Sequence, residues 1–418
     1  MKEEWKGRKF LNKKRLKLCL GIACLGLVIL LAVLTIIYSG KYGDDYPNMA
    51  KKSDEGPEFW TVLDKDSIIE HITAENMTVN EEANTEDELL LYAGDELRIA
   101  INDLKEDRYF LFLEYKALDA KAMDCYLTID TGLNEYKASV PVIWKDKEGD
   151  YPLDHYGNEL PKEQENIDSY VINAVENASR ISKSNLEISL NPSVREIILK
   201  TELLGLAVKS AYIVKKPAIQ SYSEYLAANN TNAGSNNEQL IVLEGESYSL
   251  KSDSFIRGKG LKDLALSPYE SERRKINVLD GDSWTEIGQK VLWEFDIEED
   301  GWYQIGFRYS QYSEANKPSY RMLEIDGKVP FEEFEAVSFL PTKIAKYSNK
   351  IVSHDNLKLS VYLTKGHHTL AMKAVVGPYE SIYNDILSVM TEISDIGMDL
   401  KKLTAGVTDK NRTWDMER

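Results

Sequence analysis

Cysteine is scarce in this chain of 418 residues. Two of the three cysteines, Cys19 and Cys24, lie in one uncharged segment near the N-terminus. Only Cys125 lies beyond that segment, so the rest of the chain cannot form an intrachain disulfide. A surface protein with a single thiol is more typical of bacteria than of animal ectodomains stabilised by disulfides.

Basic residues are also few once the N-terminus is set aside. The whole chain has a net charge of −18, from 51 basic and 69 acidic residues. The first 17 residues hold eight of the basic and two of the acidic residues, which leaves 43 against 67, or −24, for the remainder. Such a surface repels nucleic acid and anionic lipid, because both are negatively charged. Nucleic acid is therefore excluded as a partner.

Sequence motifs of catalysis are missing as well. We find no Ser-centred nucleophile elbow, phosphate-binding Gly loop, His-Glu-x-x-His or Cys-x-x-Cys pattern. His367 and His368 are adjacent, so on a strand they point to opposite faces and cannot share one metal. Acidic residues are so abundant that carboxylate pairs, which glycoside hydrolysis uses, indicate little. The sequence predicts a protein that is not an enzyme.

The N-terminus has the pattern of a membrane anchor. Residues 1–17 form a basic segment, and the 21 residues of Leu18–Tyr38 carry no charge. A helix of that length spans about 31 Å, which suits a bilayer core. Basic residues stay cytoplasmic, so the C-terminal bulk is expected outside the cell. We therefore predict a single-pass protein of a bacterial cell membrane, of the Gram-positive type, that contacts the lipid bilayer through residues 18–38.

Two processed alternatives compete with this uncleaved anchor. A secretory signal would end at a small-x-small cleavage site, but the chain reads TIIYSGKYG after Leu34. A lipoprotein would need an apolar residue three positions before the modified cysteine, and Gly21 holds that place before Cys24. The uncleaved anchor is preferred.

Two stretches 194 residues apart share one pattern. Each is an alternating strand, an acidic turn and a second alternating strand: LRIAINDLKEDRYFLFLEYKAL from Leu97 and VLWEFDIEEDGWYQIGFRYSQY from Val291. Tyr109 aligns with Tyr303, and Tyr115 with Tyr309, at positions expected to face a core. Period-two alternation bounded by turn residues is typical of half-buried antiparallel strands. A duplicated unit of this kind predicts two β-sandwiches in tandem.

Composition and periodicity set the expected boundaries. We predict a polar stalk over 39–85, a first sandwich over 86–216, a linker rich in Asn, Gly and Ser over 217–239, and a second sandwich over 240–389. Beyond Asp385 apolar residues recur at helical spacing, which predicts an amphipathic helix in the C-terminal segment 390–418. That helix either docks on the second sandwich or packs on a partner or a further domain. The predicted fold class is all-β, with one transmembrane helix before the sandwiches.

Three carboxylates suggest a cation site in the second sandwich. Glu244 and Glu246 are two residues apart on its expected first strand, so their side chains point to the same side, and Asp385 is expected at the end of its last strand. If those strands pair, the oxygens converge at one sheet edge, which suits Ca²⁺ better than Mg²⁺ or zinc. The alternative is that they are exposed charges that prevent edge-to-edge strand pairing.

Taken together, these motifs resemble a carbohydrate-binding module of the galactose-binding-like jelly-roll type. The resemblance rests on Glu244 and Glu246, Gly301–Tyr309, Ile325–Gly327, Leu363–Leu370 and Asp385–Ile386. Two such sandwiches behind a membrane segment are similar to the front half of Firmicute extracellular solute-binding proteins of sugar ABC transporters. The resemblance implies that the chain binds a glycan or oligosaccharide, as an accessory or truncated relative of such proteins. ABC transporter components are then expected partners.

In sugar-binding jelly rolls, aromatic rings stack on pyranose faces and polar groups at loop ends bind hydroxyls. The loop 262–289 offers Tyr269, Arg273 and Trp284, and Trp284 is the first candidate, against simple packing under the loop. Tyr248 and Tyr312 lie in or beside other loops. These five are the predicted ligand-binding residues. The alternative function is a non-catalytic structural or docking protein that binds a protein partner, through the terminal helix, and no sugar.

Overall fold

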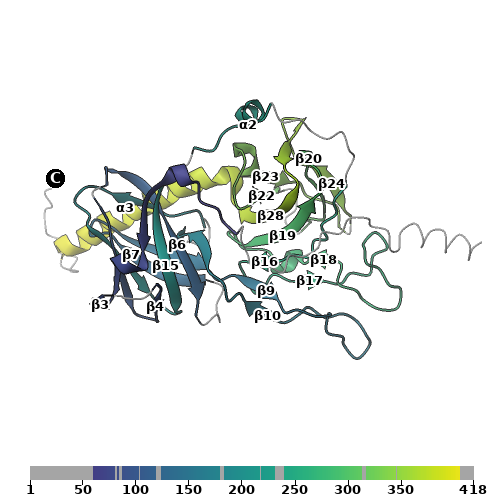
Figure 1. Cartoon of the computed structure of the whole chain (residues 1–418), viewed down its shortest axis with the longest axis horizontal. Coiled ribbons are helices and arrows are strands. Elements are labelled where there is room, and N and C mark those ends of the chain that lie inside the picture. Colours follow the sequence, from purple (N-terminus) through teal and green to yellow (C-terminus); the bar gives the residue numbers. More distant parts are fainter. Residues whose placement is uncertain are drawn as a thin grey trace, which may run out of the picture. The chain divides into compact units, whose positions relative to one another are not determined.

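The computed structural model describes most of the chain beyond the predicted stalk (Figure 1). The described residues are 60–80, 82–83, 87–102, 104–118, 124–178, 183–216, 218–230, 240–312, 317–344 and 346–404. No helix within these ranges is long and apolar enough to cross a membrane. The basic segment 1–17 and the predicted anchor 18–38 lie outside them.

The chain divides into two compact units. One comprises Lys51–Asn237 and Leu243–Arg418, and it holds both sandwiches. The other comprises Met1–Ala50 and Glu238–Val242, of which the structure describes 240–242. Strand accounts for 44% and helix for 12%, so the prediction of a mostly β fold is confirmed.

Two antiparallel sheets form the first sandwich. One has the order β1 (Ile68–Thr73), β15 (Leu206–Lys215), β6 (Asp107–Ala117) and β11 (Val171–Ala174), with β13 (Glu187–Leu190) on β6 and β4 (Leu89–Leu91) on β15. The other has the order β12 (Glu176–Asn177), β8 (Glu135–Pro141), β7 (Asp124–Asp130), β14 (Glu196–Thr201), β5 (Glu96–Ala100), β2 (Met77–Val79) and β3 (Glu82–Ala83). The 3-10 turns η1 (Lys65–Ser67) and η2 (Ala74–Asn76) flank β1.

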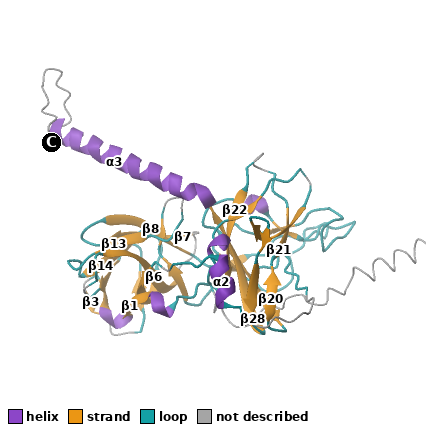
Figure 2. Ribbon diagram, turned by 90° about the horizontal axis from the view of Figure 1, so that it is seen from above, coloured by secondary structure: helices purple, strands orange, loops and turns teal. Residues whose placement is uncertain are grey.

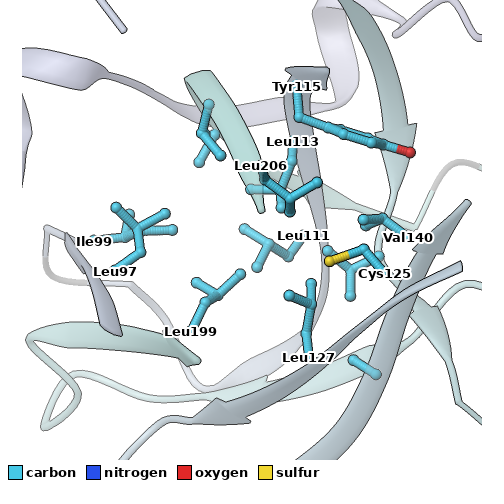
Figure 3. Close-up of a cluster of buried hydrophobic side chains, with 14 of the residues drawn as sticks. Leu97, Ile99, Leu111, Leu113, Tyr115, Cys125, Leu127, Val140, Leu199 and Leu206 are labelled. Atoms are coloured by element: carbon cyan, nitrogen blue, oxygen red, sulfur yellow. The ribbon is translucent and has the colours of Figure 1, made fainter. Parts of the chain in front are cut away.

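Alternating residues of these strands build the core between the two sheets. On β6, Leu111, Leu113 and Tyr115 face inward and are at most 1% exposed. They meet Leu97 and Ile99 of the opposite sheet in one buried cluster (Figure 3). Each such aliphatic side chain contributes about 1.5–3 kcal/mol on burial. The period-two pattern therefore predicted the core face of these strands.

The second sandwich is centred on a sheet of seven strands. Its order is β10 (Gln164–Asn166), β9 (Trp144–Asp146), β16 (Leu250–Lys251), β19 (Lys290–Ile297), β28 (Gly366–Val375), β22 (Ser319–Ile325) and β23 (Val337–Phe339). Four strand pairs complete it: β17 (Gly258–Lys259) with β18 (Val278–Leu279), β20 (Gly301–Gln304) with β27 (Ser360–Leu363), β21 (Gly306–Tyr309) with β24 (Ser348–Ile351), and β25 (Ser353–His354) with β26 (Leu357–Lys358). The short turns are η3 (Gly281–Ser283), η4 (Glu332–Phe334) and η5 (Gly377–Tyr379).

One hydrogen bond recurs at matching positions of the two repeats. The Tyr109 hydroxyl donates to the Lys105 carbonyl at 3.0 Å, and the Tyr303 hydroxyl donates to the Glu299 carbonyl at 2.8 Å. Both bonds span four residues and hold the acidic turn against the strand that follows it, like the tyrosine corner of other sandwiches. The shared bond supports the duplication. The expected burial differs, because Tyr109 is 5% exposed whereas Tyr303 is only half-buried.

A hairpin of the first sandwich extends the sheet of the second. Strand β9 pairs with β16, where Trp144 lies opposite Lys251. Lys251 is fully buried, and its ammonium group lies 3.1 Å from the Asp146 carboxylate of β9. Burial lowers the pKa of Lys251, and the charge of Asp146 offsets part of that change. Sequence periodicity did not predict this exchange of strands.

A buried ion pair and a hydrogen bond from a buried lysine join the two sandwiches beside that hairpin. Glu176 of β12 and Lys373 of β28 approach to 2.5 Å, and their side chains are only 7% and 12% exposed. Lys290 of β19 pairs with Glu324 and donates to the Trp60 carbonyl at 2.6 Å. These contacts tie residues of the first repeat to residues of the second.

Two predicted boundaries are wrong. The stalk was expected to reach residue 85, but Trp60 is 2% exposed in the first core, and β1 pairs with β15. The linker was expected over 217–239, but α2 (Tyr222–Ala228) forms within it. Ser221 and Glu224 close its N-terminus with a capping box. Both segments are polar in composition, so the sequence did not predict that their aromatic residues contact residues far along the chain.

Helix α2 packs on the second sandwich. The Tyr222 ring lies 4.8 Å from that of Phe331, and the Tyr222 hydroxyl accepts the Ser360 N–H at 3.0 Å. The Tyr225 hydroxyl accepts the Tyr362 N–H, also at 3.0 Å. Both hydroxyls thus satisfy backbone donors of β27, so the segment is an ordered part of this sandwich.

The C-terminal helix α3 spans Glu380–Thr404 as one continuous helix (Figure 2). It begins ten residues earlier than the predicted segment 390–418, which shortens the second sandwich. Eight of its described apolar side chains are 52–68% exposed: Ile382, Ile386, Val389, Met390, Ile393, Ile396, Met398 and Leu400. Of the two alternatives for this helix, these exposed side chains do not fit docking on the second sandwich.

Candidate functional site

Trp284, the first ligand candidate, lies half-buried after η3. Its indole N–H donates to the Gln289 carbonyl at 3.0 Å. The Arg321 guanidinium lies 4.5 Å from the centre of its ring, and burial lowers the pKa of Arg321 to about 10. One face of the ring is therefore covered by a cation of the chain itself. These contacts favour the packing alternative for Trp284.

Tyr248 is 4% exposed, so its prediction as a ligand-stacking residue is wrong. Its hydroxyl donates to the Asp146 carboxylate at 3.0 Å, and the Lys251 ammonium lies 5.0 Å from its ring centre. Burial and the charge of Asp146 raise the pKa of Tyr248 well above its usual range. Tyr248 is part of the contact between β9 and the second sandwich.

The three predicted metal ligands do not form one group. Asp385 lies on α3 and not at the end of the last strand, β28, so that part of the prediction is wrong. Among the residues that the structure describes, no three His, Cys, Asp or Glu side chains are placed to hold a metal ion. Glu246 is 7% exposed, and burial, with the nearby charge of Glu244, raises its pKa to about 7. The two glutamates remain together, and calcium binding stays a prediction.

The other three predicted residues are exposed. Tyr269 is 38% and Tyr312 is 52% exposed, and Arg273 is also on the surface. Arg273 lies against Gly157 of the β9–β10 hairpin, and a Cβ added there would be 3.3 Å from its Nε. Tyr312 follows β21 and, like Asp263 of the loop 262–289, lies near Tyr347. Because Tyr248 is buried, the five predicted residues do not all belong to one surface site.

A different set of side chains comes together at one end of the second sandwich. The Arg308 guanidinium lies 5.3 Å from the centre of the Tyr347 ring. Burial raises the pKa of Tyr347, and the nearby Asp263 and Tyr312 raise it further. We call Asp263, Arg308, Tyr312 and Tyr347 the loop-end surface.

Strand pairing fixes the loop-end surface. Tyr347 directly precedes β24, whose first residue, Ser348, pairs with Tyr309 of β21. Next to it, two hydrogen bonds join Gln311 and Thr342. The Thr342 N–H donates to the Gln311 carbonyl at 2.6 Å, and the Gln311 N–H donates to the Thr342 hydroxyl at 3.0 Å. The two segments that carry Tyr312 and Tyr347 are thereby held side by side.

Sequence patterns alone pointed to part of this surface. Tyr312 was predicted, and Arg308 belonged to the motif that carried the family resemblance. Tyr347 and Asp263 were missed, because each lies in an irregular segment with no period to mark it. An aromatic residue just before a strand, as Tyr347 is, was the available signal.

An interior cavity of the first sandwich is too small to be a ligand site. It is lined by residues that include Tyr115, Val142 and Ile167, and its volume is about 10 Å³. That is about the space of one water molecule.

Comparison with known proteins gives one family match. The model of the bacterial solute-binding protein, 4-helix bundle domain, matches residues 381–418, which include most of α3. No curated protein matches the chain.

Several solved structures resemble parts of the chain at low identity. A carbohydrate-binding module of Cellvibrio mixtus lichenase 5A, in complex with cellotriose, is 12% identical with a TM-score of 0.21, and the match covers 36% of this chain and 99% of that one. An isomalto-dextranase of Arthrobacter globiformis T6, complexed with panose, is 9% identical with a TM-score of 0.23, over 69% of this chain and 33% of that one. A cycloisomaltooligosaccharide glucanotransferase of Paenibacillus sp. is 11% identical with a TM-score of 0.23, over 75% and 47%. TM-scores of this size do not establish a shared fold.

Proposed function

We propose that the chain is a carbohydrate-binding protein that uses the loop-end surface of its second sandwich. The observation that carries the proposal is the grouping of Tyr312 and Tyr347 with Asp263 and Arg308. Tyr312 is 52% exposed, and Asp263 lies close enough to the half-buried Tyr347 to raise its pKa. A ring that is open to solvent, as that of Tyr312 is, suits stacking on a pyranose face.

The polar members of the surface complement the rings. Arg308 offers several N–H donors in a fixed plane, and Asp263 accepts hydrogen bonds. A sugar hydroxyl both donates and accepts, so a donor and an acceptor beside a stacking ring match a ring that carries several hydroxyls. None of this arrangement requires a reaction of the ligand, and we propose binding without catalysis.

The cellular setting follows from the N-terminus. We propose that residues 18–38 anchor the chain in a bacterial cell membrane, with both sandwiches outside. The eight basic residues of the first 17 and the uncharged segment behind them support this topology. The family match over 381–418 supports a relationship to solute-binding proteins, and we propose that the partners include components of a sugar ABC transporter.

A second candidate function is docking through α3. Its eight exposed apolar side chains and its match to a helical bundle domain favour packing against further helices. A helix with an apolar face of this width is typical of a bundle helix. In this alternative the sandwiches act as a spacer and bind no sugar.

A glycan array with the full chain in mild detergent tests the first function. We expect retention of at least one glycan, and about two- to tenfold weaker binding for Tyr312→Ala or Tyr347→Ala, since one aromatic contact is worth about 0.5–1.5 kcal/mol. Tyr92→Ala is the control, because Tyr92 is 61% exposed on the first sandwich. If no glycan is retained, or if both loop-end variants bind as the parent does, the proposal is wrong.

A further inference from the structure

The tip of the β9–β10 hairpin, residues 153–160, is held in one conformation by its own side chains. The Asp154 carboxylate accepts the Tyr156 N–H at 2.8 Å, the Asn158 N–H at 2.9 Å and the Asn158 side-chain amide at 2.9 Å. The Asp154 N–H donates in turn to the Asn158 carbonyl at 2.9 Å. The hydrogen bonds from Asn158 lower the pKa of Asp154, so the carboxylate keeps its charge and its acceptors at neutral pH.

The tip is also fastened to the loop 262–289 of the second sandwich. The Asn158 side-chain oxygen accepts the Arg274 N–H at 2.8 Å, and the Glu159 N–H donates to the Arg274 carbonyl at 2.9 Å. The Glu159 carboxylate accepts the Ile276 N–H and the Lys275 ammonium, both at 2.8 Å. Because both loops are fixed to each other, side chains from the two sandwiches share one surface.

This rigid support presents an exposed aromatic residue. Tyr156 is 74% exposed, and the His155 ring lies beside it, tilted by 43°, with 3.7 Å between the ring centroids. An aromatic residue in such a loop often packs into the protein and anchors the loop, but the Tyr156 side chain is exposed to solvent. A ring that is already fixed loses little conformational entropy when a ligand stacks on it.

A cation of the second sandwich lies against Gly157, the residue that follows Tyr156. The Arg273 side chain runs over Gly157, whose φ of +79° and missing Cβ leave room for it. The neighbouring acids Glu159 and Glu270 pair with Lys275, at 2.8 and 3.5 Å, and not with Arg273. Among the described residues no carboxylate forms an ion pair with the Arg273 guanidinium, although the chain as a whole is strongly acidic.

We propose that His155, Tyr156 and Arg273, the hairpin-tip surface, form a second glycan site that takes a sugar bearing a carboxylate. The Tyr156 ring stacks on the pyranose, and the Arg273 fork binds the carboxylate with two parallel hydrogen bonds. The site goes beyond the loop-end surface and depends on the proposed function only for the class of ligand. Two sites on one rigid pair of sandwiches would bind a polymeric glycan more tightly than either alone.

The test uses immobilised oligosaccharides that contain galacturonic, glucuronic or sialic acid, each beside its carboxyl-reduced counterpart. The full chain in mild detergent is expected to retain at least one acidic form and to bind the reduced form at least tenfold more weakly. Tyr156→Ala and Arg273→Gln should each weaken the acidic form at least tenfold and leave any neutral glycan bound. Tyr92→Ala is the control for an exposed tyrosine. All three side chains are exposed, so the variants are expected to fold.

The loop-end variants separate the two proposals. Tyr312→Ala should leave the carboxylate-dependent part of the binding intact. If no acidic sugar is retained, or if Tyr156→Ala and Arg273→Gln bind it as the parent does, the hairpin-tip site is wrong. In that case a neutral glycan that is no longer bound by Tyr312→Ala would still support the loop-end site. If Tyr312→Ala alone removes all binding, acidic sugars included, the hairpin-tip site is also wrong.

Discussion

The ion pair between Glu176 and Lys373 should be one of the strongest couplings in the protein. The two groups belong to different repeats, approach to 2.5 Å and are 7% and 12% exposed. Burial by itself lowers the pKa of Lys373, but the charge and hydrogen bond of Glu176 outweigh it, so the pKa of Lys373 is raised overall. Removing either partner leaves the other charge buried without its direct partner, although Glu324 still acts on Lys373.

The expected cost follows from that burial. Glu176→Gln or Lys373→Met alone should lower the free energy of unfolding by about 3–5 kcal/mol, because a buried charge is left unpaired. The double variant should cost less than the sum of the two by about 2 kcal/mol or more, since neither charge then remains. A domain is stable by only about 5–15 kcal/mol, so each single change is large.

Urea unfolding of the four proteins in a double-mutant cycle measures this coupling. The control is the exposed pair Lys147–Glu163, which is 2.6 Å apart with side chains 51% and 76% exposed. Its coupling should be about 1 kcal/mol at most, because solvent screens the charges. If the Glu176–Lys373 cycle gives a coupling no larger than this control, the buried pair does not hold the two repeats together and the reasoning fails.

Two further predictions concern the second sandwich. Because the pKa of Glu246 is raised to about 7, the folded state binds a proton that the unfolded state has lost, so stability should fall as pH rises from about 4.5 to about 7. Thermal melting across that range should show this fall in stability, and Glu246→Gln should flatten the pH profile. Added Ca²⁺ should raise the melting temperature near pH 7 only when Glu246 is present. A flat pH profile in the parent would contradict the assignment. Ser221→Ala removes the capping box of α2 and should lower the free energy of unfolding by about 1 kcal/mol, with the exposed Ser271→Ala as the control, and equal stability of the two variants would show that the cap contributes nothing.

Alternation in the sequence was enough to predict the strands and the inward faces of the first core, such as Leu111 and Leu113 on β6. It did not predict which strands pair, because a period of two is the same for any partner. For that reason the transfer of β9 to the other sheet was missed, and Tyr248 was expected on the surface although Asp146, 102 residues away, buries it.

Other errors came from the ends of elements. Asp385 was placed on a strand because the helical spacing was recognised only after it, whereas α3 already begins at Glu380. The loop-end surface depends on irregular segments whose positions are set by long-range pairing, so Tyr347 and Asp263 had no local signal. Element boundaries are the least reliable part of such predictions for the same reason.

The strand exchange between β9 and β16 limits how the repeats can be separated. A fragment beginning at residue 240 would expose β16 as an unpaired edge, and unpaired edges promote aggregation. It would also leave the buried Lys251 without the Asp146 carboxylate. We therefore expect that the second sandwich does not fold as an independent module, and that the two repeats have to be produced as one chain.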